Sequence, residues 1–259
     1  MIEHTIRAFD ADLRELAHKI AEMGRLDDAQ IADAIDAWVK RDAALAKRVI
    51  AADDRVDALQ REIEEKAATT IARRQPMAVD LREILGALRI SNDLERVGDL
   101  AENVAKRMML VTEEFRLSEV LVQLRHMVDV VRDQLARVLQ SYERRDVALA
   151  LDVWRKDQEI DALNSGLFRE LLTFMMEDPR NIAFCTHMLF CAKNVERMGD
   201  HATNIAETVY YIVQGSQLKE ERPKADVTSR ETLPFRREGG RSNRGRRSGG
   251  RQGFNKTLA

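Results

Sequence analysis

The organisation of this chain is decided by two short stretches, Leu94-Glu95-Arg96-Val97-Gly98-Asp99 and Val195-Glu196-Arg197-Met198-Gly199-Asp200. A shift of 101 residues superimposes them, and 7 of the 12 positions in 94–105 are then identical in 195–206. A shift of 104 superimposes 41–59 on 145–163, with 10 of 19 positions identical. Two blocks of identity in the same order indicate an internal duplication of about 100 residues per copy.

Long helices are predicted throughout both copies. The first 214 residues hold only five Gly and two Pro, a composition that favours helix over sheet. Helix breaks are expected at Gly24, at Gln75-Pro76, near 112–116 and at Asp178-Pro179. The predicted helices are 2–23, 28–73 (with a kink at Arg41-Asp42), 77–111, 117–141, 145–177 and 180–214.

The simplest architecture for these helices is all-α, with two antiparallel three-helix bundles in tandem. We therefore predict a first bundle at 1–112, a second at 116–214 and a disordered Arg/Gly-rich tail at 215–259. The tail carries 12 Lys and Arg against 5 Asp and Glu, whereas the preceding residues carry 30 against 39. Such a tail suits either a solvated extension, which we favour, or nucleic-acid binding.

Membrane insertion and secretion are not expected. The chain has no run of 18 or more apolar residues, and Met1-Ile2-Glu3-His4 begins no secretory signal. The expected compartment is therefore the cytoplasm. The two cysteines, Cys185 and Cys191, are spaced like buried helix residues and not like a CxxC site.

The acidic motif forms a stripe on its helix. Residues four apart differ by about 40° around a helix, so Glu95, Asp99 and Asn103 share one face, as do Glu196, Asp200 and Asn204. The apolar residues of the segment lie on the opposite side, and the carboxylates are expected to project away from the bundle interior. A solvated outer face is the simplest alternative to a binding site.

A second acidic pair makes a metal site the stronger hypothesis. Asp53 and Asp57 on the preceding helix recur as Asp157 and Asp161, on the flank of an apolar face. Four clustered carboxylates require a compensating cation, and oxygen ligands suit Mg²⁺, Mn²⁺, Ca²⁺ or iron better than structural zinc or copper. We predict one metal site per copy, formed by Asp53, Asp57, Glu95 and Asp99 and by Asp157, Asp161, Glu196 and Asp200.

Five further residues in or beside the two motifs have open roles. Gly98 and Gly199 allow either a close approach to the helix backbone or tight helix packing. Arg96 and Arg197 are expected to form salt bridges with the carboxylates, or else to contact an anion. His201 is a weak candidate ligand, because it points about 100° away from Asp200.

The chain resembles the PhoU family of phosphate-uptake regulators. The resemblance rests on His4 with Phe9, on Asp53-Asp54-Arg55-Val56-Asp57, on Ala72-Arg73-Arg74-Gln75-Pro76-Met77-Ala78-Val79-Asp80-Leu81-Arg82 and on the two Glu-Arg-x-Gly-Asp motifs. It extends from residue 1 to about residue 229.

The resemblance implies two pseudo-symmetric three-helix bundles, often dimeric, with metal ions at the E(D)xxxD motifs and iron clusters in some members. The expected cofactor is a divalent or trivalent ion, iron, Mn, Mg or Zn. The resemblance also implies a non-enzymatic negative regulator that acts on the phosphate ABC transporter, through its ATPase subunit, and on a sensor histidine kinase, and that associates with the inner membrane through these partners. The alternatives are a ferritin-like di-iron protein, whose Glu-x-x-His ligands do not accompany the acidic motifs, and a helical nucleic-acid-binding protein.

Overall fold

The first and second helices of each bundle are joined by the same local structure. Arg41 and Arg145 adopt left-handed conformations, with φ of 54° and 57°. The aspartates that follow, Asp42 and Asp146, cap the next helix by accepting hydrogen bonds from its first backbone amides. The duplicated Arg-Asp dipeptide therefore ends one helix and begins the next in both copies.

The computed structural model describes residues 2–111, 118–220 and 222. In these ranges the chain forms helices and a short 3₁₀ turn, η1 (Pro179–Asn181), and no strand. The helices are α1 (Ile2–Lys40), α2 (Ala43–Arg74), α3 (Val79–Met109), α4 (Ser118–Arg144), α5 (Val147–Arg155), α6 (Asp157–Glu177) and α7 (Ile182–Gln214).

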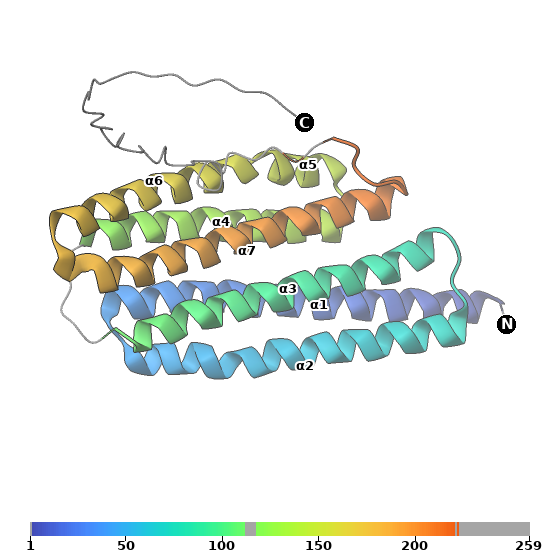
Figure 1. The fold of residues 1–259 in the computed structure, drawn as a ribbon. Coiled ribbons are helices and arrows are strands. Elements are labelled where there is room, and N and C mark those ends of the chain that lie inside the picture. The colour runs from blue at the N-terminus through green and yellow to red at the C-terminus, as the bar shows by residue number, and fades with distance from the viewer. Residues whose placement is uncertain (1, 112–117, 221, 223–259) are drawn as a thin grey trace, which may run out of the picture.

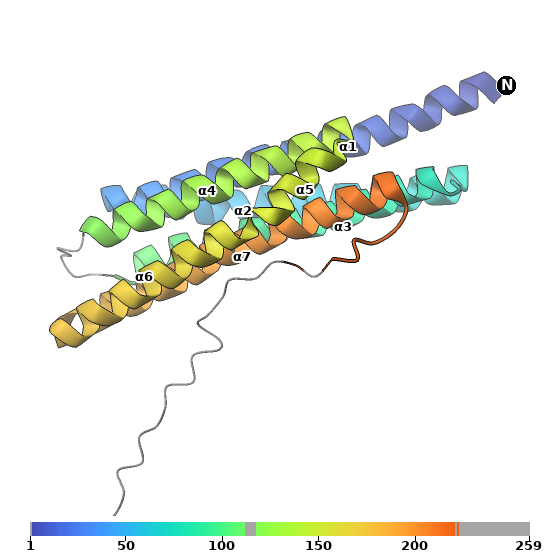
Figure 2. The same cartoon turned by 90° about the horizontal axis from the view of Figure 1, so that it is seen from above.

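The helices form two three-membered layers (Figure 1). α1, α2 and α3 make the first layer, and α4, α7 and the α5–α6 pair make the second. α5 and α6 follow one another along α7, and together they take the place that α2 has in the first copy (Figure 2). The predicted all-α fold of two tandem bundles is confirmed.

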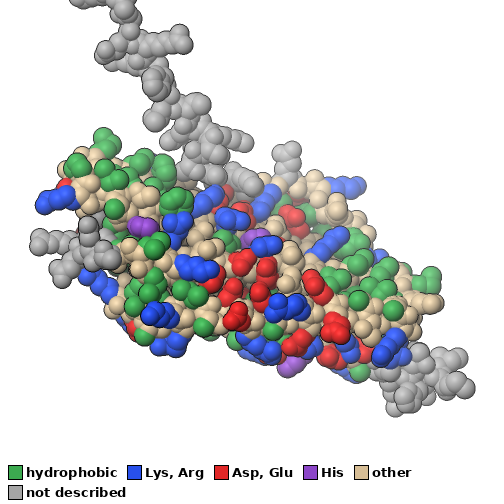
Figure 3. All heavy atoms as spheres, turned by 60° about the horizontal axis from the view of Figure 1, so that its bottom comes forward, with side chains coloured by type: hydrophobic (Ala, Val, Ile, Leu, Met, Phe, Trp, Pro, Cys, Tyr) green, Lys and Arg blue, Asp and Glu red, His purple; other side chains and the backbone are tan. Residues whose placement is uncertain are grey.

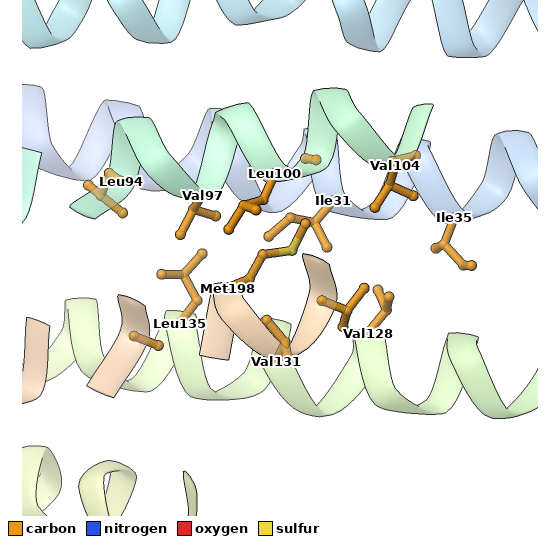
Figure 4. Close-up of a cluster of buried hydrophobic side chains, with 14 of the residues drawn as sticks. Ile31, Ile35, Leu94, Val97, Leu100, Val104, Val128, Val131, Leu135 and Met198 are labelled. Carbon is orange, nitrogen blue, oxygen red and sulfur yellow. The ribbon is translucent and has the colours of Figure 1, made fainter. Parts of the chain in front are cut away.

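The two bundles share one hydrophobic core. α3 packs along α7 and α1 packs along α4. Figure 4 shows Met198 of α7 pointing toward Ile31 of α1 and Leu100 of α3, with Val131 of α4 nearby; each of these four side chains is at most 3% exposed. Burial of this apolar surface stabilises the pairing of the two copies.

Ion pairs also join the two bundles. Arg132 Nε lies 2.7 Å from Asp28 Oδ1 and its Nη2 lies 2.9 Å from Asp28 Oδ2, which is a two-pronged contact between α4 and α1. Arg145 Nη2 lies 2.6 Å from Glu83 Oε2. The relative position of the copies is therefore specified by directional contacts as well as by apolar burial.

The prediction that Gly24 ends the first helix is wrong. α1 continues through Gly24 to Lys40, and the true break is the Arg41-Asp42 dipeptide. A Cβ atom at Gly24 would lie 2.2 Å from Leu139 Cδ1, so this glycine permits a close approach of α1 to α4. Glycine inside a helix costs only about 1 kcal/mol, which the packing of a long helix overcomes.

The predicted helix 145–177 is interrupted at Lys156, between α5 and α6. The carbonyl oxygen of Lys156 accepts a hydrogen bond from Gln134 Nε2 of α4, at 3.1 Å. A side chain from a neighbouring helix thus satisfies a backbone group at the interruption, and Asp157 begins the next helix beside this point.

The C-terminal segment begins with a helix cap. Gly215 is left-handed, with φ of 74°, and its amide donates to the Tyr211 carbonyl. Leu218 packs against the core, so the described part of 215–259, namely 215–220 and 222, lies against the bundle. The rest of the predicted Arg/Gly-rich tail lies outside the described residues. No helix in the described ranges is long and apolar enough to cross a membrane.

Candidate functional site

The first acidic cluster lies between α2 and α3. One carboxylate oxygen each of Asp53, Asp99 and Glu102 lies within 4.8 Å of the other two. Asp57 and Glu95 are close enough for their charges to act on Asp53. Figure 3 shows acidic side chains gathered near the middle of the face that it presents, with Lys and Arg side chains around them.

Burial and mutual repulsion raise the pKa of two carboxyl groups in this cluster. Burial, with the neighbouring charges of Glu102 and Asp99, raises the pKa of Asp53 to about 7. Burial and the Asp99 charge also raise the pKa of Glu95 above its ordinary value. A bound cation would oppose both shifts, because it stabilises the ionised carboxylates.

The local cations sit at the rim. Arg96 Nη1 lies 2.8 Å from Asp99 Oδ2, and its Nε lies 3.3 Å from Glu95 Oε2. The Arg96 side chain is 52% exposed. Lys106 pairs with Glu102 and is also half-exposed. Exposed partners of this kind are screened by water and contribute little, so they leave the inner part of the cluster uncompensated.

Two polar residues beneath the cluster, Asp27 and Gln30 of α1, were not predicted from the sequence to belong to the site. Asp27 is 0% exposed, and no described residue donates a hydrogen bond to either of its carboxylate oxygens. Gln30 is 4% exposed, with its amide nitrogen and oxygen both without a partner in the described chain. Burial, followed by the charges of Asp53 and Glu95, raises the pKa of Asp27 well above its ordinary value.

Gly98 is the point where these groups converge. A Cβ atom there would lie 2.9 Å from Asp53 Oδ1 and 3.4 Å from both Asp27 Oδ1 and Gln30 Oε1. At Gly199 the nearest atom would instead be Ile160 Cδ1, at 2.5 Å. Of the two roles left open for these glycines, Gly98 has the close approach of polar groups and Gly199 has tight helix packing.

A signal for the missed residues exists in the sequence. Asp27 lies within the apolar stripe of α1, between Met23 and Ile31, where a carboxylate is unexpected. Gln30 recurs as Gln134 at the same shift of 104 residues, and both are buried. A polar residue that occupies the same core position in both copies indicates a special role more strongly than one that occurs in a single copy.

The second acidic cluster has a different composition. Its four predicted residues are Asp157 and Asp161 of α6 and Glu196 and Asp200 of α7. At the shifts that relate the two copies, Val131 replaces Asp27 and Thr203 replaces Glu102. The second copy therefore has two fewer carboxylates at equivalent positions.

The second cluster is also compensated from within the chain. Thr203 Oγ1 donates to Asp157 Oδ1 at 3.0 Å, and the guanidinium of Arg222 contacts both Asp157 and Asp200. Lys193 Nζ lies 2.8 Å from Glu196 Oε1, whereas Glu196 Oε2 is buried without a hydrogen bond. Burial raises the pKa of Glu196, although the bond from Lys193 opposes this.

The prediction that the carboxylates of the motif project outward is wrong for Glu95 and Glu196. The Glu95 side chain is only 15% exposed, and Glu196 is 6% exposed, as deeply buried as Asp157 and Asp161 of the preceding helix, which are 3% and 5% exposed. The reason is that the acidic flank of α3 or α7 faces the neighbouring helix of the same bundle instead of solvent. Asp99 and Asp200, one turn further on, keep exposures of 38% and 32%.

The asparagines of the two acidic stripes and Arg197 lie in different surroundings. Asn103 and Arg197 are exposed, and Asn204 Nδ2 lies 3.4 Å from Asp93 Oδ1. His201 Nδ1 lies 2.9 Å from the same Asp93 oxygen. These last two side chains therefore connect α7 to α3 across the boundary between the bundles.

Comparison with known proteins gives one consistent result. The PhoU domain model matches residues 20–108 and 124–209. A protein of Rhizobium meliloti (strain 1021), named phosphate-specific transport system accessory protein PhoU homolog, is 52% identical over 226 residues, which cover 87% of this chain and 95% of the relative. A Caulobacter vibrioides (strain NA1000 / CB15N) protein of the same name is 47% identical over 229 residues, covering 88% and 100%.

Solved structures agree with this result. The crystal structure of PhoU from Pseudomonas aeruginosa is similar with a TM-score of 0.77 and 38% identity, over 80% of this chain and 100% of that one. The phosphate transport system regulatory protein PhoU from Streptococcus pneumoniae has a TM-score of 0.75 and 27% identity, over 82% and 100%. The similarity thus extends through both copies and the full length of each solved chain.

Proposed function

Because the chain belongs to the PhoU family, we propose that it is an accessory protein of a phosphate-specific transport system and a negative regulator of phosphate uptake and of the phosphate-starvation response. The observation that carries this proposal is the identity of 52% with a relative bearing that name, over 95% of the relative's length. Similarity over both copies supports transfer of the whole role and not of one motif.

The proposed mode of action is that of an adaptor. It binds the ATPase subunit of the transporter and the sensor histidine kinase, acts as a homodimer, and lies at the inner membrane through these partners. Exposed large hydrophobic side chains near the α6–α7 connection support a protein-binding role, since such side chains commonly mark interaction surfaces. Met176 is 86% exposed, Ile182 is 47% exposed and Phe190 is 50% exposed.

The adaptor also binds metal in this proposal. The residues of the first cluster fit a hard cation, because Asp27 and Gln30 present buried, unpartnered oxygens and Gly98 leaves room for them. Asp53 and Asp99, with Glu102, Asp57 and Glu95, would hold it from two helices. Oxygen ligands favour Mg²⁺, Mn²⁺ or iron. The bound ion would neutralise the cluster and tie α2 to α3.

Elemental analysis tests the metal-binding part. Wild-type protein and an Asp53→Asn/Asp99→Asn variant would be purified without chelator and analysed alongside Asp33→Asn, which changes an exposed aspartate of α1. We expect metal in the wild type and in Asp33→Asn and a clear loss in the double variant. Equal metal content in all three, or none in any, would refute metal binding at the first cluster.

A reporter strain tests the regulatory part. Deletion of the gene should leave phosphate-responsive promoters active in high phosphate, and the wild-type gene should restore repression. Complementation with Asp53→Asn/Asp99→Asn then asks whether regulation requires the cluster. Normal repression in the deletion strain would contradict the regulatory function whatever the metal result.

A ferritin-like di-iron enzyme is the weaker candidate. The sequence contains one Glu-x-x-His tetrad, Glu15 to His18, but it does not lie at either acidic cluster. Glu15 pairs with Lys66 at 2.6 Å, and His18 is exposed beside a groove between α1 and α4. Turnover of ferrous iron by the purified protein would favour the enzyme.

A further inference from the structure

The two acidic clusters differ in one feature that the duplication does not explain. Arg222, which follows the last helix, reaches into the second cluster. Its Nε lies 2.9 Å from Asp157 Oδ2, and its Nη2 lies 2.8 Å from Asp157 Oδ1 and 2.6 Å from Asp200 Oδ1. The Arg222 side chain is 16% exposed. A two-pronged contact with one carboxylate and a third bond to another is a strong arrangement for guanidinium.

The position of Arg222 is that of a bridging cation. Asp157 and Asp200 are the counterparts of Asp53 and Asp99, which lie on neighbouring helices with their oxygens within 4.8 Å. In the first copy no described residue places a cation between the pair, since Arg96 contacts Asp99 from the rim. In the second copy the guanidinium joins α6 to α7 at the equivalent place.

The chain after α7 delivers this residue. The segment turns back at Gly215, toward α5 (Figure 1), and Leu218 packs on the core. Gly215 itself lies against the Arg82 side chain, whose carbon Cζ would be 3.2 Å from a Cβ atom there. The approach of residues 215–220 to the bundle is thus set by packing, and this places Arg222 at the mouth of the cluster.

The composition of each cluster matches its counter-charge. The first copy has Asp27 and Glu102 where the second has Val131 and Thr203. With fewer carboxylates, the second cluster is compensated by one guanidinium and by the hydroxyl of Thr203, which donates to Asp157. The first cluster has two more carboxylates, and no described guanidinium lies between Asp53 and Asp99; in its ionised form it therefore suits a cation of higher charge or more than one cation.

We infer that Arg222 is a built-in cation that excludes metal from the second cluster, so that the chain loads metal at the first cluster and admits it to the second only when Arg222 is displaced. This inference rests on the proposed binding of metal to the acidic clusters, and it adds a control on access of metal to the second cluster. Metal and Arg222 compete for Asp157 and Asp200, so a metal ion bound there releases the C-terminal segment. The second cluster can bind metal only while Arg222 is displaced, so its apparent affinity for metal is the intrinsic affinity multiplied by the small fraction of molecules in that state.

The experiment isolates the second cluster in the full-length protein. Asp53→Asn removes a central carboxylate of the first cluster, and in this background Mn²⁺ alone is titrated by calorimetry. Arg222→Gln is compared with Arg180→Gln, which removes the same charge from an exposed pair with Asp178 in the same copy. We expect Arg222→Gln to bind Mn²⁺ about tenfold more tightly or better, and Asp200→Asn to abolish the gain.

The possible outcomes separate the inference from the proposed function. No gain with Arg222→Gln, or an equal gain with Arg180→Gln, would overturn the inference, since net charge alone would then explain the result. If Asp53→Asn leaves wild-type Mn²⁺ binding unchanged, the proposed first site fails, whereas a gain specific to Arg222→Gln still supports exclusion at the second.

A second measurement follows the segment itself. Trypsin cleavage after Lys219, detected by mass spectrometry, reports release of residues 215–220 from the bundle. Lys219 is the site to follow because trypsin does not cleave between Arg222 and Pro223. We expect slow cleavage in metal-free wild type, faster cleavage in Arg222→Gln, and acceleration of the wild type by excess Mn²⁺. Cleavage at one rate in both proteins, with and without Mn²⁺, would overturn the inference.

Discussion

Replacement of Asp27 by valine should stabilise the metal-free protein, although it removes an ionisable residue from a polar cluster. Asp27 is 0% exposed and neither of its oxygens has a hydrogen-bond partner among the described residues. The chain itself shows that valine suits this position, because Val131 is the counterpart of Asp27 in the second copy and is also 0% exposed.

The expected gain follows from three contributions. Removal of an unsatisfied buried polar group recovers about 1–3 kcal/mol, burial of the valine methyl groups adds about 1 kcal/mol, and imperfect packing costs about 1 kcal/mol. The net increase in the free energy of unfolding is about 2 kcal/mol, which corresponds to a rise of about 4–8 °C in Tm for a protein of this size.

The gain should depend on pH. The pKa of Asp27 is raised in the folded protein, so the native state retains a proton that the unfolded chain releases above its ordinary pKa. Since the native state then binds more protons, wild-type stability falls as pH rises. Asp27→Val lacks this loss, and its advantage should be larger at about pH 8 than at about pH 5.

Urea and thermal unfolding in the presence of a chelator, followed by circular dichroism, provide the assay. Asp33→Val is the control, because it makes the same chemical change at an exposed position of α1. With Mn²⁺ in place of chelator, the wild type should gain stability and Asp27→Val should gain less. A destabilised Asp27→Val protein, or a pH-independent effect equal to that of Asp33→Val, would refute this reasoning.

Three further outcomes are expected. Because the pKa of Asp53 is raised to about 7, wild-type stability in chelator should fall as pH rises toward neutrality, and Asp53→Asn should flatten this decline in a series of urea midpoints; parallel curves would contradict it. Met198→Ala, at a 1% exposed position between the bundles, should lower the free energy of unfolding by about 2–5 kcal/mol, and a loss well under 1 kcal/mol in urea titration would argue against a shared core. Asp42→Ala removes a cap whose Oδ1 lies 2.9 Å from two backbone amides and should cost about 1 kcal/mol by thermal unfolding, whereas an unchanged Tm would mean that the turn holds without it.

Much of the fold is readable from the sequence because its determinants are local. The duplicated Arg41-Asp42 and Arg145-Asp146 dipeptides specify the same turn, and helix breaks at Pro76 and Pro179 follow from the missing amide and fixed φ of proline. The prediction at Gly24 was wrong because glycine can either end a helix or permit close contact between two helices. Only the position of Leu139 on another helix distinguishes these two roles.

The acidic pairs on the second and third helices of each copy were also predictable, since helical spacing and duplication mark Asp53 with Asp99, and their counterparts in the second copy, as a set. Their burial was not predictable. Whether a carboxylate on the flank of a helix meets water or a neighbouring helix depends on the rotation of the two helices about their axes. In this protein that rotation buries Glu196, and it raises the pKa of Asp53 instead of leaving an ordinary surface acid.

The sequence by itself determined the duplication, the helical class and the motif Glu-Arg-x-Gly-Asp, because each of these is expressed over a few turns of chain. Only the tertiary structure decided that the two copies of the motif are unequal. Asp27 comes from a helix that the motif does not include, and Arg222 comes from beyond the last helix. Electrostatic compensation acts through space and not along the chain, so the occupant of each cluster depends on which distant side chains the fold brings to it.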